Sequence, residues 1–215
     1  MKVLITGANR GIGAALMSTL TVRGNSVLGT SRSGDAGLLP LDVTDPAAHR
    51  ALAEKLAGTP IDALVCNAGV YLDKGQPLAT GFAAEVWAQS FAVNVTGVFL
   101  AVQALLPNLA LSEAPRIAII SSQMGSDQRA GGGSYAYRAS KAAALNLGRN
   151  LAADLRPRGI AVGIYHPGWV QTDMGGATAE ITPEAAAKGL ADRLAGLNLS
   201  NTGCFETWDG RTHPF

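Results

Sequence analysis

The fold is decided by the N-terminal stretch Lys2-Val3-Leu4-Ile5-Thr6-Gly7-Ala8-Asn9-Arg10-Gly11-Ile12-Gly13. A short apolar run enters a turn with three glycines, and an apolar helical pattern follows. Glycines at such a turn let the backbone approach a pyrophosphate, and the helix N-terminus offers free N–H groups to the anion. The spacing is G-x-x-x-G-x-G and not the commoner G-x-G-x-x-G. The stretch therefore predicts the first unit of a dinucleotide-binding fold, with a plain small-residue turn as the alternative.

The rest of the chain continues to alternate strand and helix patterns. Several strand candidates are apolar on both faces, as in a parallel sheet covered by helices on each side. Strand–helix alternation implies right-handed crossovers. We predict one α/β domain over residues 1–215, a doubly wound, Rossmann-like fold with a mostly parallel sheet of about seven strands and helices on both faces. The expected strands are 2–6, 26–31, 38–41, 61–67, 116–121, 160–165 and 203–207, and the expected helices are 11–23, 46–57, 83–109, 135–156 and 183–197.

The composition narrows the function classes. Hydrophobic residues make up 47% of the 215 residues, charged residues 15%, and the formal net charge is +1. This balance, without a Lys/Arg block, argues against nucleic-acid or membrane-surface binding. No segment is expected to approach the length of a membrane-spanning helix. Cys66 and Cys204 are expected to be buried free thiols in a reducing cytoplasm, and the histidines and cysteines share no metal-ligand spacing, so no metal is expected.

Tyr137-Arg138-Ala139-Ser140-Lys141 is the stretch most informative about chemistry. Residues four apart are neighbours on a helix, so Tyr137 and Lys141 share one face. A phenol has a reference pKa of about 10, and a nearby cation lowers it. The pair is therefore expected to supply a proton donor and acceptor that works near pH 7. The alternative is a chance pair on a solvated helix face.

The end of the second expected strand bears on cofactor choice. A site that prefers NAD usually has an acidic residue there for the ribose 2′-hydroxyl. This chain has Arg32 instead, and Arg10 lies in the glycine turn. Two cations favour a 2′-phosphate, so NADP(H) is preferred and NAD(H) remains possible; the alternative is that both arginines are solvated. Asp42, before Val43, is expected either to bind the adenine amino group or to be a turn residue.

In chain order these motifs resemble those of the short-chain dehydrogenase/reductase family, over essentially the whole length. Three stretches are similar to the small C-signal/sniffer-like carbonyl reductases within it: Tyr137-Arg138-Ala139-Ser140-Lys141, His166-Pro167-Gly168-Trp169-Val170 and Trp208-Asp209-Gly210. The motifs that carry the resemblance are Thr6–Gly13, Asp42-Val43, Asn67-Ala68-Gly69, Asn94, Ser121-Ser122, Tyr137-x-x-x-Lys141, Pro167-Gly168 and Thr172.

The resemblance implies a role for each catalytic position. Tyr137 would protonate the carbonyl oxygen as a hydride arrives, and Ser122 would polarise that oxygen. Lys141 would hold the nicotinamide ribose and lower the pKa of Tyr137, while Asn94 would position a water in a proton relay. Ser121 remains an alternative to Ser122, because the gap from Ser122 to Tyr137 is 15 residues, a little longer than is common.

The resemblance also implies a set of cofactor contacts. Thr172 would bind the nicotinamide carboxamide, and Asn67 would help pack the cofactor. Residues 171–182 are expected to form a small-sided, mobile lid, and 127–133 a flexible flap. The full expected cofactor set is Gly7, Asn9, Arg10, Gly11, Ile12, Gly13, Arg32, Asp42, Val43, Asn67, Ala68, Gly69, Tyr137, Lys141, Pro167, Gly168, Val170 and Thr172.

The function hypothesis that follows is NADPH-dependent hydride transfer to a ketone or aldehyde, or the reverse oxidation of an alcohol. The expected partners are a small-molecule substrate and further copies of the chain, in a homodimer or homotetramer. The alternative is a dinucleotide-binding sensor of the same fold without catalysis; such proteins tend to lose the Tyr/Lys pair, which this chain keeps. A sugar-nucleotide epimerase is a weaker third choice, because such enzymes normally need a longer C-terminal substrate domain.

Overall fold

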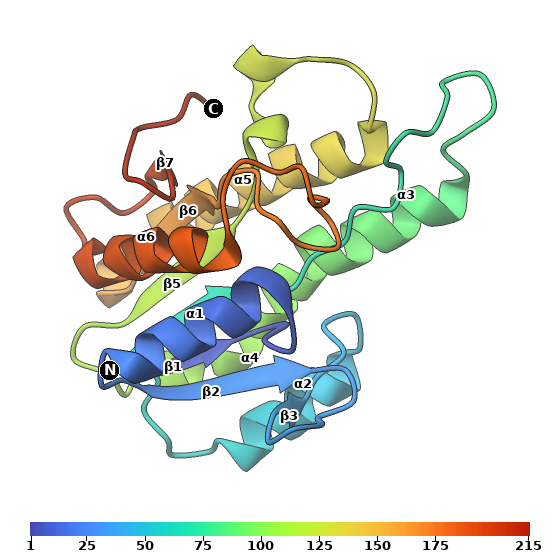
Figure 1. Cartoon of the computed structure of the whole chain (residues 1–215). Coiled ribbons are helices and arrows are strands. Elements are labelled where there is room, and N and C mark those ends of the chain that lie inside the picture. The colour runs from blue at the N-terminus through green and yellow to red at the C-terminus, as the bar shows by residue number, and fades with distance from the viewer.

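A seven-stranded, all-parallel sheet runs through the centre of the protein (Figure 1). The computed structural model describes residues 1–215. Every expected strand is present, with ends that differ by no more than two residues, and the predicted doubly wound α/β fold is confirmed. The strands, in the spatial order β3-β2-β1-β4-β5-β6-β7, are β1 (Lys2–Ile5), β2 (Ser26–Ser31), β3 (Leu39–Pro40), β4 (Ala63–Cys66), β5 (Arg116–Ile120), β6 (Ala161–His166) and β7 (Phe205–Thr207).

Helices cover both faces of this sheet. Two of them begin at a proline that follows a capping residue: the side chain of Asp45 accepts a hydrogen bond from Ala47 N, and that of Thr182 from Ala185 N. Capping of this kind supplies an acceptor for a first-turn N–H that has none inside the helix. The helices are α1 (Gly11–Val22), α2 (Pro46–Lys55), α3 (Ala84–Phe91), α4 (Gly97–Leu109), α5 (Tyr135–Leu155) and α6 (Pro183–Gly196), with short 3₁₀ turns η2 (Gln123–Gly125), η3 (Asp127–Arg129) and η4 (Arg156–Arg158).

The core has two halves, one on each face of the sheet. Side chains alternate along a strand, so Val3 and Ile5 point to one face of β1 and Leu4 to the other. Val3 and Ile5 pack with α1 and α6, while Leu4 packs with α2, α4 and α5. Both layers are visible in Figure 1, where α1 and α6 lie side by side over the sheet.

The expectation that no segment approaches the length of a membrane-spanning helix was wrong. Residues Ala84–Leu109 form a continuous helical stretch of 26 residues that is long and apolar enough to cross a membrane by length and composition alone. A five-residue π-helix, η1 (Ala92–Thr96), joins α3 to α4 within it. The apolar side of α4 packs into the core through Val98, Val102 and Leu105, so its hydropathy is that of a core helix.

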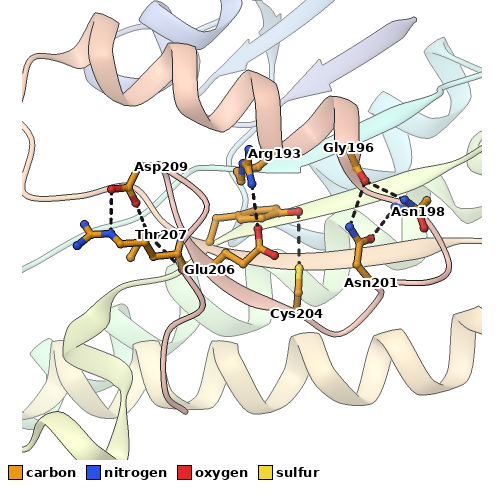
Figure 2. A network of polar contacts seen from close by, with 10 residues as sticks. Arg193, Gly196, Asn198, Asn201, Cys204, Glu206, Thr207 and Asp209 are labelled. Atoms are coloured by element: carbon orange, nitrogen blue, oxygen red, sulfur yellow. Dashed lines mark hydrogen bonds and ion pairs between the residues drawn. The ribbon is translucent and has the colours of Figure 1, made fainter.

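The C-terminal edge of the sheet is held by a polar network (Figure 2). Arg193 of α6 pairs with Glu206 of β7 at 3.6 Å. Cys204 lies 3.8 Å from the Tyr165 hydroxyl, and Asn201 donates to the carbonyl of Gly196. These contacts fix the last, three-residue strand against β6 and α6.

The strand order reverses between β1 and β4. From β1 the chain proceeds outward to β2 and β3, then returns and continues through β4 to β7 on the other side. In open α/β sheets the loops leave such a switch point in opposite directions, which opens a crevice at the carboxyl ends of the strands. The fold therefore places a ligand site beyond Ile5 and Cys66.

Candidate active site

A cavity of about 870 Å³ lies at this switch point. Its volume is within the usual range for ligand pockets, at the upper end. The residues around it come from the glycine turn, from the ends of β2, β4 and β5, and from α5 and the segment after β6. Sixteen of the expected site residues line it: Gly7, Asn9, Arg10, Gly11, Ile12, Gly13, Arg32, Asp42, Val43, Asn67, Ala68, Gly69, Tyr137, Lys141, Pro167 and Thr172.

Asn67 holds the glycine turn in place. Its side-chain amide donates to the carbonyls of Thr6 and Gly7, at 3.0 and 2.9 Å. The Thr6 hydroxyl in turn accepts from the backbone N–H groups of Asn67 and Ala68. A Cβ on Gly13 would lie 2.1 Å from the Gly7 carbonyl oxygen, so this turn has room only for glycine. The bracing role of Thr6 was not foreseen.

The start of α1 suits an anion. No side chain caps this helix, and its first residues, Gly11 to Gly13, line the cavity. The uncapped N–H groups and the helix dipole together favour a negative charge there. The glycine turn therefore has the geometry that a pyrophosphate needs.

The two arginines that line the cavity, Arg10 and Arg32, differ in their surroundings. Arg32 is exposed at the cavity and makes no ion pair. Arg10 pairs with Asp173 at 2.6 Å, and both side chains are largely solvent-exposed. One carboxylate oxygen of Asp42 accepts hydrogen bonds from the N–H and the hydroxyl of Thr44. These hydrogen bonds lower the pKa of the Asp42 carboxyl, and the charge of Arg32 lowers it further. Asp42 is thus a turn residue whose second carboxylate oxygen makes no hydrogen bond within the protein.

Tyr137 lies near the start of α5 and is 7% exposed. The two serines after β5 have different environments. The Ser121 hydroxyl donates to the Lys141 carbonyl at 3.0 Å, and Ser121, unlike Ser122, lines the cavity. The Ser122 side chain acts on the Tyr137 phenol and lowers its pKa, although no hydrogen bond within 3.5 Å joins the two hydroxyls. The structure thus brings Ser122 to Tyr137 and ties Ser121 to the helix backbone, while the choice of catalytic serine stays a prediction.

Gly125 allows the segment that carries Ser121 and Ser122 to pack directly against α5. A Cβ there would lie 2.6 Å from the backbone carbon of Lys141, so η2 can rest directly on the helix only if this residue is glycine. Within η2 the Ser122 hydroxyl accepts from Met124 N at 3.1 Å. The Ser-x-x-Gly pattern therefore sets the approach of Ser122 to Tyr137.

Lys141 is buried one turn along α5 from Tyr137. Its Nζ donates to the Ile120 carbonyl at 3.0 Å and lies 5.7 Å from the centroid of the Tyr137 ring. Burial lowers the pKa of Lys141 to about 8. Burial also raises the pKa of Tyr137 to about 12, above its ordinary value. The expected lowering of the Tyr137 pKa toward 7 is therefore not found, because desolvation raises this pKa more than Ser122 lowers it.

Asn94 lies inside the π-helix and is buried. Its amide donates to the Val70 carbonyl and the Ser140 hydroxyl, and its oxygen accepts from the Val70 N–H. Both donors of the side chain are therefore used. A π-helix in this place is typical of functional sites, since it rearranges the backbone hydrogen bonds locally. Asn94 joins the loop after β4 to α5, and its role in a water relay stays a prediction.

Two residues of that loop lie against Tyr137 and were missed by the sequence patterns. The Tyr71 ring stacks on the Tyr137 ring, with centroids 4.1 Å apart and planes inclined by 19°. Asp73 is completely buried and accepts hydrogen bonds from the N–H groups of Ala136 and Tyr137. No local motif marks them, because both are far from Tyr137 in sequence.

The segment expected to be the lid contacts both sides of the cavity. Lys74 donates to the Met174 carbonyl at 3.3 Å, and Arg10 pairs with Asp173. Gln171 and Ile181 close the base of the segment through backbone hydrogen bonds. The lid therefore lies over the cavity and is held by exposed contacts that are weak individually.

The remaining expected residues lie beside the cavity. Val170 is buried and pairs with Ile181 at the base of the lid, while Gly168 borders a smaller cavity of about 200 Å³ near the C-terminus. The segment expected to be a flap, 127–133, is fastened to α5 by Arg138, which donates to the carbonyls of Arg129 and Gly132. His166 ends β6, buried next to His213, and lines the smaller cavity.

Comparison with known proteins identifies the family. The family model described as short chain dehydrogenase matches residues 1–182. The chain belongs to the short-chain dehydrogenase/reductase family. It is 38% identical over 168 residues to the C-signal protein of Myxococcus xanthus, a match that covers 77% of this chain and 99% of that protein. Members of this family are NAD(P)-dependent oxidoreductases that act on small molecules, and the resemblance predicted from the motifs is confirmed.

Solved structures give the same result. The NADPH-bound carbonyl reductase from chicken fatty liver is 30% identical, with a TM-score of 0.89 over 100% of this chain and 98% of that one. The carbonyl reductase Sniffer of D. melanogaster is 26% identical, with a TM-score of 0.93 over 100% and 99% of the two chains. The predicted similarity to the C-signal/sniffer-like reductases is thus confirmed.

Proposed function

We propose that this protein is an NADPH-dependent carbonyl reductase, with Tyr137 as the general acid. The observation that carries the proposal is the arrangement of one continuous cavity. Its outer end presents the unpaired Arg32, and its inner end holds Tyr137 and Lys141. Relatives of the same fold include a carbonyl reductase with NADPH bound. When bound, NADPH supplies a hydride, and the protein supplies placement and a proton.

The chain's own residues divide the work of holding the cofactor. Asn67 and Thr6 fix the glycine turn, which receives the pyrophosphate at the N-terminus of α1. Arg32 grips the 2′-phosphate, because a guanidinium can make two parallel hydrogen bonds to one phosphate. The second oxygen of Asp42 would accept from the adenine amino group, and Thr172, which lines the cavity beside Gly11, would bind the nicotinamide carboxamide.

At the inner end, Ser122 and Tyr137 act on the same oxygen atom. Ser122 donates a hydrogen bond that polarises the carbonyl, and the Tyr137 hydroxyl gives up its proton as the carbonyl becomes an alcohol. Lys141 remains charged at neutral pH, because its pKa of about 8 lies above 7. Its ammonium holds the ribose hydroxyls and stabilises the phenolate that Tyr137 leaves behind.

A substrate screen tests this function. Purified protein is mixed with NADPH and a panel of aldehydes, ketones and diketones, and the loss of NADPH absorbance is followed. We expect turnover of at least one class of carbonyl, with NADPH used in preference to NADH. A protein that binds NADPH yet reduces no member of the panel is a dinucleotide sensor and not a reductase.

We also propose a cytosolic location. Both cysteines are free thiols, and burial raises the pKa of Cys66 to about 12, which makes that thiol unreactive. Free thiols of this kind are common in reducing compartments. Fractionation of cells that produce the protein, with detection by antibody, tests the location.

The same fold suggests a homodimer or homotetramer. Phe99 on α4 is 43% exposed, and Ala142 and Ala143 on α5 are half-buried, so these helices carry apolar and small surface residues. A second copy would cover this surface. Sedimentation equilibrium measures the assembly directly, and a monomer at micromolar concentration would contradict the proposal.

A further inference from the structure

The loop after β4 crosses the start of α5 and contacts Tyr137 in two places. We propose that Tyr71 and Asp73 are positioning residues for Tyr137, and that the Asp73 carboxylate opposes ionisation of the Tyr137 phenol. This inference rests on the proposed role of Tyr137 as general acid. It adds a support and a like charge beside the acid, supplied by a segment more than sixty residues earlier in the chain.

Asp73 first fixes the backbone of Tyr137. One of its oxygens accepts from Ala136 N at 2.8 Å and from Tyr137 N at 3.3 Å. Ser134, the residue at the N-cap of α5, makes no capping hydrogen bond and has a left-handed φ of +49°. The cap that this helix needs therefore comes from Asp73, and a carboxylate there is also favoured by the helix dipole.

Capping of α5 alone does not explain why this position is an aspartate. The other oxygen of Asp73 is buried without a hydrogen-bond partner. A buried carboxylate with a free oxygen is costly, and a neutral cap such as Asn or Ser would satisfy the same N–H groups without burying a charge. A charge retained at this cost points to an electrostatic effect on a neighbour.

That neighbour is the Tyr137 phenol. Burial is the main reason that the pKa of Tyr137 is raised, Ser122 opposes it, and Tyr71 and Asp73 raise the pKa further. The ammonium of Lys141, 5.7 Å from the ring centroid, faces the same phenol with the opposite charge. A like charge disfavours the phenolate and an unlike charge favours it, so Asp73 and Lys141 act against each other.

Tyr71 restrains the ring itself. It stacks on one face of Tyr137, and its hydroxyl hydrogen-bonds with the hydroxyl of Ser134 just before α5. Stacked aromatic pairs contribute about 0.5–1.5 kcal/mol beyond the area they bury. Asp73 thus fixes the backbone of Tyr137, and Tyr71 fixes the orientation of its ring.

The charge effect is tested by Asp73→Asn, which keeps the shape and an oxygen for the cap. The protein is labelled with isotope-enriched tyrosine; it contains four tyrosines, and Tyr137→Phe identifies the Tyr137 resonance. Titration by NMR, in the free protein and with NADP⁺, gives the midpoint of Tyr137 whether or not a substrate is known. We expect Asp73→Asn to lower this midpoint by roughly half a unit or more, as expected for one charge at an effective dielectric near 20.

Kinetics give a second, independent readout. Reduction needs the proton on Tyr137, so the rate falls as pH rises through its pKa. With saturating NADPH, the alkaline limb of kcat/KM for the carbonyl should therefore move to lower pH in Asp73→Asn. Asp45→Asn is the matched control, since Asp45 also caps a helix and lies away from Tyr137. It should alter stability alone.

The outcomes distinguish a failure of this inference from a failure of the proposed function. An unchanged Tyr137 midpoint in a folded Asp73→Asn protein overturns the inference and leaves Asp73 as a helix cap. If the wild type reduces no carbonyl, the proposed function fails, and the NMR titration still tests Asp73.

The stacking is tested by a pair of substitutions at Tyr71. Tyr71→Phe keeps the ring and should stay within about twofold of wild type, while Tyr71→Leu should lower kcat by about two- to tenfold with the KM for NADPH unchanged. Equal losses in the two variants would show that the Ser134 hydrogen bond matters and the stack does not.

Discussion

The ammonium nitrogen of Lys141 lies 5.7 Å from the centroid of the Tyr137 ring and donates to the backbone carbonyl of Ile120. Burial moves both pKa values toward the neutral forms, that of Lys141 down to about 8 and that of Tyr137 up to about 12. At pH 7 the pair is therefore a charged ammonium beside a neutral phenol. This is the protonation state that a proton donor to a carbonyl requires.

The rate with NADPH should depend on pH through Lys141. Its ammonium is present below a pKa of about 8 and is lost above it, so kcat/KM for NADPH should be flat at neutral pH and fall above about pH 8. Lys141→Arg is the matched variant, because a guanidinium stays protonated throughout; it should be slower but should lack this limb. A wild-type limb near the ordinary lysine value of 10.5 would contradict the effect of burial.

Tyr137→Phe should abolish most turnover while leaving NADPH affinity within about twofold. The ring still packs against Tyr71, and only the proton is lost. Positioned acid–base groups contribute about 10²–10⁴-fold, and a loss of kcat of that size is expected. Single-turnover kinetics and fluorescence titration with NADPH measure the two quantities. A Phe variant with a near-wild-type rate would remove Tyr137 from the mechanism.

Lys141→Ala is the companion variant to Tyr137→Phe. It should weaken NADPH binding and lower kcat together, since Lys141 serves both the ribose and the tyrosine in the proposed mechanism. The same two measurements check it. Unchanged NADPH affinity in Lys141→Ala would show that the buried ammonium does not reach the ribose.

Features with a local cause were predictable from the sequence. The strands are recognisable because a parallel sheet buried on both faces needs runs such as Ile117–Ile120, which the structure places in β5. The first turn needs glycine because the Gly7 carbonyl leaves no room for a Cβ on Gly13. Tyr137 and Lys141 share a face because the helix period places them there. Each of these depends on residues within a few positions of one another.

Features set by tertiary contacts were not predictable. Asp73 reaches Tyr137 across 64 positions, and Arg10 meets Asp173 across 163. No short motif encodes such contacts. The pKa of Tyr137 was expected to fall toward 7, because a lysine at i+4 is visible in sequence and the burial of the phenol is not. The helix over 83–109 was predicted, but the π-helix Ala92–Thr96 that joins its two halves was not.

Asn67→Ala should weaken cofactor binding through the glycine turn, without removing any group that is proposed to bind the cofactor's phosphates. The substitution removes the hydrogen bonds to the carbonyls of Thr6 and Gly7, which are then left without that donor. Each such loss costs about 1–3 kcal/mol, so we expect lower stability and NADPH affinity reduced by about tenfold. Thermal unfolding and fluorescence titration measure both.

Asn25→Ala serves as the control for Asn67→Ala. Asn25 makes a similar side-chain hydrogen bond, to the carbonyl of Leu20, at the far end of α1. It should lower stability with no change in NADPH affinity. Equal effects of the two variants on NADPH would mean that Asn67 acts through global stability and not through the glycine turn.

NADPH should be preferred over NADH, and Arg32 should carry more of this preference than Arg10. Arg32 follows β2 at the adenine end and has no ion-pair partner, so its guanidinium is available to a 2′-phosphate. Arg10 already pairs with Asp173, and that exposed pair must open before Arg10 can help, at a cost of up to about 1 kcal/mol. Charge-assisted hydrogen bonds contribute about 1.5–3 kcal/mol, so Arg32→Ala should weaken NADPH binding by about ten- to a hundredfold.

NADH lacks the phosphate and should bind as before, while Arg10→Ala should weaken NADPH binding by less than about fivefold. Fluorescence titration of both cofactors on the three proteins decides the matter. Equal weakening of NADPH and NADH binding in Arg32→Ala would show that Arg32 does not bind the 2′-phosphate. Equal wild-type affinities for the two cofactors would contradict the assignment of NADPH as the preferred one.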